Sequence, residues 1–96
     1  MPQLEIIRLN EILKWVRRSK SMLYSDQQKK LFPSSIKLGG ERATGYLKHE
    51  VEAVLAARAA GYSNDQIKKL VSDLYSQRQE LLKSILSSIP SMGERV

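Results

Sequence analysis

The sequence predicts one small, mainly α-helical domain that carries a single β-hairpin. Four segments place apolar residues at helical spacing, and a fifth holds two strand-like runs separated by Gly39 and Gly40. Residues 8–48 carry ten Lys/Arg and three Asp/Glu, a net +7, whereas residues 61–96 carry five and four, a net +1. A positive field confined to one segment favours a polyanionic partner; the alternative is ordinary surface lysine.

The first two helices are short and lie close together in the chain. Apolar residues at helical spacing predict one helix over residues 9–16, and Ser19 is placed to cap a second from Lys20 to about Lys30. Leu23 and Leu31 should face inward. Two short helices joined by a tight turn indicate a helix-turn-helix, although no glycine stands in this turn.

The next segment reads as a hairpin. Pro33 ends the second helix, Ile36-Lys37-Leu38 alternates as a half-buried strand does, and Arg42 to Tyr46 should return as its partner. The hairpin either completes the core or forms a wing that carries Lys37 and Arg42 to DNA. The basic helix before it favours the wing, and therefore a winged helix-turn-helix.

Two further helices follow. Residues 48–60 form the third, ended by Gly61, and Ser63 with Gln66 makes a capping box that opens a fourth from residue 64 to about 86. The apolar stripe of this last helix is longer than a three-helix core needs. Residues 64–86 either fold back, pair with a second copy or bind another protein. The domain limits expected are 8–60 for the winged helix-turn-helix, 61–87 for a C-terminal helical extension, and 1–7 and 88–96 for flexible ends.

The sequence offers little chemistry for catalysis. It contains no cysteine, and its one histidine, His49, reads as a plain surface residue because metal sites need several convergent donors. No enzymatic activity, cofactor or metal is expected. The longest purely apolar run, residues 53–57, is far too short to cross a bilayer, and the N-terminus has no secretory pattern. We therefore expect a soluble, cytoplasmic, nucleoid-associated protein without a membrane partner.

In order and spacing, several short motifs resemble the AlpA family of prophage regulators, which is related to small phage excisionases and, more distantly, to MerR-type winged helices. The resemblance covers residues 8 to about 80 and is carried by Arg8-Leu9 with Glu11, Ser19-Lys20-Ser21 with Tyr24, Phe32-Pro33, Ile36-Lys37-Leu38-Gly39, Arg42, Gly45-Tyr46, Glu50-Val51 and the Ala-Arg-Ala-Ala-Gly stretch at 57–61. Family members usually have threonine at the place of Met22, and many have an apolar residue near the place of Asp26. The base preference of the family is therefore not transferred to this chain.

The resemblance implies sequence-specific binding near an attachment site, as a regulator of an integrase gene, as a directionality factor that favours excision, or as both. Integrase is then a further partner. The rival interpretation is a protein-interaction adaptor that uses the long apolar helix. On the DNA-binding interpretation, helix two enters the major groove, and the contacting residues are Arg17, Arg18, Ser19, Lys20, Ser21, Tyr24, Gln28, Lys29, Lys30, Lys37 and Arg42.

Different roles are expected within this set. Lys20 is placed to donate to guanine, Gln28 to pair with adenine, and Tyr24 to hold a phosphate or a thymine methyl. The residues expected to anchor phosphates are Arg17, Arg18, Lys29, Lys30 and Lys37. Arg42 should enter a minor groove.

Overall fold

The protein is built from four α-helices and a small three-stranded antiparallel sheet, in a computed structural model that describes residues 4–39 and 44–88. In these ranges the elements follow the order β1 (Ile6–Ile7), α1 (Leu9–Val16), α2 (Lys20–Gln28), β2 (Ile36–Lys37), β3 (Thr44–Leu47), α3 (Lys48–Ala59) and α4 (Asn64–Ser87). The expectation of a mainly helical domain with a small β element is confirmed. None of the helices described is both long and apolar enough to span a bilayer.

β3 is the central strand of the sheet. β2 pairs with it antiparallel, with Lys37 opposite Thr44, so the expected strand pairing is confirmed. Gly39 has a φ of +99°, the positive value expected of a hairpin turn. Gly40 and Arg42, also placed in this hairpin by the sequence, lie outside the described residues.

The other edge of the sheet was not expected. Residues 1–7 were predicted to be a flexible end, but Ile6 and Ile7 form β1 and pair antiparallel with Leu47 and Tyr46. Ile7 is buried in the core. A two-residue strand has no periodicity to detect, and its partner lies about forty residues away, so only the fold brings the two together.

The helix boundaries follow from local capping. The Ser19 hydroxyl accepts a hydrogen bond from the Met22 amide, which starts α2. The capping box of Ser63 and Gln66 is present at the start of α4, as predicted.

The end of α2 differs from the prediction, because the helix stops at Gln28 and not at about Lys30. Lys30 adopts a left-handed conformation with a φ of 65°. Its amide donates to the Gln27 carbonyl (3.1 Å), and the Leu31 amide donates to the Asp26 carbonyl (2.8 Å). This is the Schellman arrangement, with lysine at the position that glycine usually occupies.

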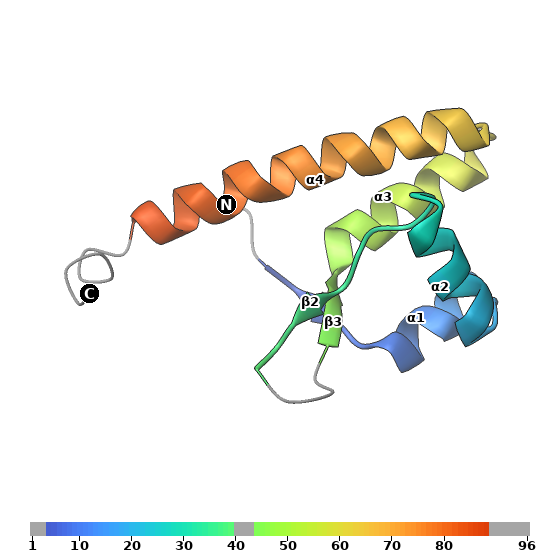
Figure 1. The fold of residues 1–96 in the computed structure, drawn as a ribbon, viewed down its shortest axis with the longest axis horizontal. Helices are drawn as coiled ribbons and strands as arrows, with labels where there is room; N and C mark the ends of the chain where they lie inside the picture. The colour runs from blue at the N-terminus through green and yellow to red at the C-terminus, as the bar shows by residue number, and fades with distance from the viewer. Residues whose placement is uncertain (1–3, 40–43, 89–96) are drawn as a thin grey trace.

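The core lies where α1, α2, α3 and the sheet meet, and the first half of α4 covers it. Ile12, Leu23 and Val51 are fully buried there, together with Ile67 of α4. Figure 1 shows α4 crossing over α3 and continuing beyond it. The first half of α4 therefore folds back on the domain, whereas Leu86 near its end is 52 % exposed.

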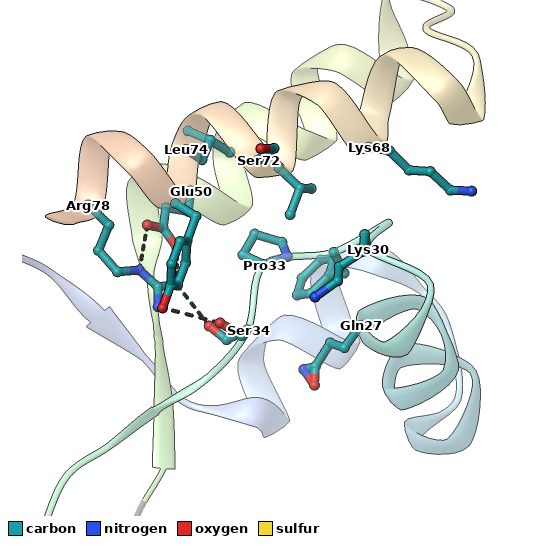
Figure 2. Close-up of a pocket in the computed structure, with 12 residues that line it drawn as sticks. Gln27, Lys30, Pro33, Ser34, Glu50, Lys68, Ser72, Leu74 and Arg78 are labelled. Carbon is teal, nitrogen blue, oxygen red and sulfur yellow. Dashed lines mark hydrogen bonds and ion pairs between the residues drawn. The ribbon is translucent and has the colours of Figure 1, made fainter.

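A buried ion pair also joins α3 to α4. The Glu50 carboxylate accepts from Arg78 Nε (2.9 Å) and from Arg78 Nη2 (2.5 Å), and Nη2 also donates to the Ser34 carbonyl (2.9 Å). Figure 2 shows the three side chains converging from α3, α4 and the loop before β2. Removing either charge would leave the other buried without a partner, so the pair favours this position of α4 on the domain.

Candidate nucleic-acid interface

The turn between α1 and α2 is three residues long. Arg17 ends α1 in a left-handed conformation (φ 55°, ψ 39°), with its amide donating to the Leu13 carbonyl (3.0 Å). Ser19 then caps α2. Arg17 thus takes the conformation for which glycine would be the ordinary choice, which explains how a tight turn forms without one.

α2 presents a polar, basic face to solvent. Lys20, Ser21, Tyr24 and Gln28 are all exposed on it. The Lys20 ammonium lies 6.0 Å from the centre of the Tyr24 ring, at the limit of a cation–π contact. The first turn of α2 contains no acidic residue. Its positive helix end is therefore not neutralised by a local carboxylate and favours an incoming phosphate.

A hydrogen bond ties α2 to the sheet beside this face. The Gln27 amide donates to the Tyr46 hydroxyl at 2.6 Å. Burial raises the pKa of the Tyr46 phenol above 10, partly offset by this hydrogen bond. Thr44 and Tyr46, two residues apart on β3, point to the same side of the sheet, and Lys37 pairs with Thr44. Lys37 therefore projects on the side of the sheet that faces α2.

We name the exposed set of Lys20, Ser21, Tyr24, Gln28 and Lys37 the α2 face. It groups the predicted base-reading residues of helix two with the one described cation of the hairpin, which projects on the side of the sheet that faces α2. Arg42, the other predicted hairpin cation, lies outside the described residues. The α2 face has the composition of a surface that contacts phosphates and base edges: ammonium groups, a hydroxyl, a phenol and an amide.

Three other predicted phosphate contacts do not lie on the α2 face. Arg17, Arg18 and Lys29 line a cleft of about 620 Å³ between the α1–α2 turn and the α3–α4 corner. With 100° per residue, Lys29 is turned by about 180° from Lys20 around α2. These three residues therefore line a surface that is separate from the α2 face.

Asp26, the acidic residue that departs from the resembled family, has a clear role in this cleft. Its carboxylate accepts from Arg18 Nε (2.9 Å) and from Arg18 Nη2 (3.3 Å). Asp26 is thus engaged with Arg18 on the cleft side of α2. It does not place an unpaired negative charge on the α2 face.

Lys30 belongs to a third site. It lines a hollow of about 510 Å³ under α4 together with Gln27, Phe32, Lys68 and Tyr75. In Figure 2, Lys30 and Lys68 lie at the opposite end of this hollow from Arg78. The hydrogen bonds to Glu50 raise the pKa of the Arg78 guanidinium above its usual value, so this group stays charged.

Sequence reasoning missed three of the groups that shape these surfaces. Arg58, on the last turn of α3, lines the cleft but lies about forty residues from Arg17 and Arg18 in the chain. The Gln27–Tyr46 bond and the Glu50–Arg78 pair also join residues that are far apart in the chain, 19 and 28 positions respectively. The sequence offered one signal, Arg78 within the apolar stripe of the fourth helix, because a charged side chain in such a stripe is rarely buried unless it is paired.

The part of the chain that the structure describes holds no group of three or more His, Asp or Glu side chains arranged to bind a metal ion. Comparisons with protein-family models, curated proteins and solved structures found no significant match.

Proposed function

We propose that this protein is a sequence-specific DNA-binding protein with a winged helix-turn-helix architecture, in which α2 enters the major groove. The observation that carries the proposal is the α2 face. Lys20 and Tyr24 meet at the start of α2, and the Gln27–Tyr46 bond holds that helix against the strand beside Lys37. A helix and a strand pair held together in this way support joint contact with one duplex.

The dimensions and charges support the same docking. A helix with its side chains is about 10–12 Å across, and the major groove of B-DNA is about 12 Å wide. Lys20 and Ser21 stand at the N-terminal end of α2, where the helix dipole favours phosphate. Lys20 then donates to guanine, Gln28 pairs with adenine, and Tyr24 contacts a phosphate or a thymine methyl.

The direct test is binding to duplex DNA as a function of salt. If about five phosphates are neutralised, log K should fall with log salt with a slope of about −4 to −5. Lys20→Ala should weaken binding, whereas Lys83→Gln, which removes a charge from the exposed end of α4, should not. A slope near zero, or equal affinities for these two variants, would contradict the proposal.

In the cell, we propose that the protein regulates an integrase gene, promotes excision of a prophage or genomic island, or does both. This step is supported by the resemblance of its motifs to the AlpA family and by its basic α2 face. Footprinting on DNA flanking its own gene would identify the site. An excision assay with purified integrase would then separate the roles, because only a directionality factor stimulates recombination in it.

The adaptor hypothesis is the second candidate, and the exposed end of α4 favours it. Leu81, Leu82 and Ile85 are half-buried and Leu86 is 52 % exposed, beyond the part of α4 that contributes to the core. An apolar helix end of this kind can bind a partner or a second copy. Sedimentation at micromolar concentration tests self-association. Partner binding that survives alanine at Lys20 and Lys37, with no gel shift on duplex DNA, would support the adaptor.

A further inference from the structure

The cleft between the α1–α2 turn and the α3–α4 corner concentrates positive charge. Arg17, Arg18, Lys29 and Arg58 line it, against one carboxylate, that of Asp26. Four cations less one anion leave a net +3 in a single cleft, half of the formal +6 of the whole chain. Such a local field attracts an anion.

Two arginines of this cleft, Arg18 and Arg58, are held by neighbours that engage only part of each guanidinium. Arg18 uses Nε and Nη2 for Asp26, so its Nη1 is not occupied by that pair. Arg58 donates from Nη1 to the Asn64 side-chain oxygen at 3.0 Å, which leaves Nε and Nη2 outside that bond. Arginines oriented in this way lose less side-chain freedom when they bind a phosphate.

The position of the cleft relative to the α2 face indicates which phosphate it meets. Gln27, which bonds to the sheet beside Lys37, and Lys29, which lines the cleft, are about 160° apart around α2 at 100° per residue, and the predicted base-reading residues lie between them. A helix seated in the major groove has one sugar-phosphate backbone on each side, because the groove is only about as wide as the helix. The backbone next to Lys37 and the backbone next to the cleft would therefore belong to opposite strands.

From this geometry we infer that the cleft formed by Arg17, Arg18, Lys29 and Arg58 binds the sugar-phosphate backbone across the major groove from the one that the hairpin contacts. Groups that contact phosphates then flank α2 on both sides. Arg58, on α3, becomes a DNA-contacting residue. The inference rests on the proposed function and adds to it a strand assignment for each basic group.

The test is ethylation interference on a duplex that the wild-type protein has selected from a random pool. Wild type should show two clusters of sensitive phosphates, one on each strand, facing each other across the major groove. With Arg58→Gln, ethylation of the phosphates in one cluster should no longer reduce binding. With Lys37→Gln, the same should hold for the other cluster. Arg58→Gln should also weaken binding by roughly twofold to fivefold, and its salt slope should be shallower by about 0.9.

Two controls make the result specific. Arg58→Lys keeps the charge and should retain the salt slope, while Lys83→Gln removes a charge far from the cleft and should leave both clusters intact. Thermal melting confirms that each variant is folded. If Arg58→Gln gives the same interference pattern and slope as Lys83→Gln, the cleft inference is wrong while the DNA-binding proposal stands.

Other outcomes are equally decisive. If Arg58→Gln leaves the footprint on the first duplex intact but abolishes capture of a second, unlabelled duplex, the cleft binds a separate DNA segment and the strand assignment is overturned. If wild type selects no duplex at all, the proposed function and the cleft inference both fail.

Discussion

Replacing Arg17 with glycine should change stability and DNA affinity in opposite directions. Arg17 is exposed and adopts a φ of 55°, in the left-handed region. That conformation costs an ordinary residue about 1–2 kcal/mol, and the larger freedom of glycine in the unfolded chain costs about 0.5–1 kcal/mol. Arg17→Gly should therefore raise the free energy of unfolding by about 0.5–1 kcal/mol.

Two assays on one pair of variants test this reasoning. For a domain of this size, the gain corresponds to a rise in Tm of about 2–8 °C, measurable by circular dichroism. Arg17→Gly should also lose one phosphate contact, so the salt slope of DNA binding becomes shallower by about 0.9. Arg17→Ala is the matched control, because it removes the same charge but keeps a β-carbon in the left-handed turn.

The two variants should therefore bind DNA equally weakly and differ only in stability. A Tm for Arg17→Gly at or below that of Arg17→Ala would refute the argument about backbone strain. Wild-type affinity and salt slope in both variants would refute the phosphate contact. The combination expected, a protein that becomes more stable as it loses affinity, would indicate that arginine is retained at this turn for binding.

Three further predictions concern the packing around the interface. Arg78→Met should destabilise the fold by about 3–5 kcal/mol in urea titrations, because it leaves Glu50 buried and unpaired. Adding Glu50→Leu should recover most of that loss, and equal stability of the single and double variants would count against a buried pair. Gly45→Val should cost about 1–3 kcal/mol in the same assay, since its β-carbon would collide with Cγ2 of Ile6 across the sheet, and an unchanged midpoint would mean that β1 does not lie there. Burial raises the pKa of Tyr46, so the contribution of this phenol to stability is fully present below pH 10 and is lost as pH rises beyond that value through the folded-state pKa. Tyr46→Phe should lose less stability in this range, and parallel pH profiles of the two proteins would contradict the raised pKa of Tyr46.

Local signals in the sequence predicted most of the helical framework. The Ser19 cap of α2 and the Ser63–Gln66 box of α4 depend on residues within three positions of each other, so they can be read without a fold. The pairing of β2 with β3 was predicted for a similar reason, since the two strands lie close in the chain. The left-handed end of α2 at Lys30 was missed because glycine, the usual residue there, is absent.

The sequence predicted a solvent-facing basic segment, but not how its residues are arranged. Every predicted contact residue that the structure describes is exposed, in agreement with a solvent-facing basic segment. Which of them share a surface depends on the rotation of α2 against the sheet. That rotation is set by buried Leu23 and by the Gln27–Tyr46 bond, nineteen residues apart.

By itself, the sequence determined where the helices begin, which segment is basic and which residues face water, because caps, charge and periodicity act over a few residues. Only the tertiary structure decided that the basic residues divide among the α2 face, the cleft and the hollow under α4, and that Arg58 lines the cleft. It also decided that β1 completes the sheet and that Glu50 meets Arg78. These contacts join residues far apart in the chain, and burial of a common core, which no local pattern encodes, brings them together.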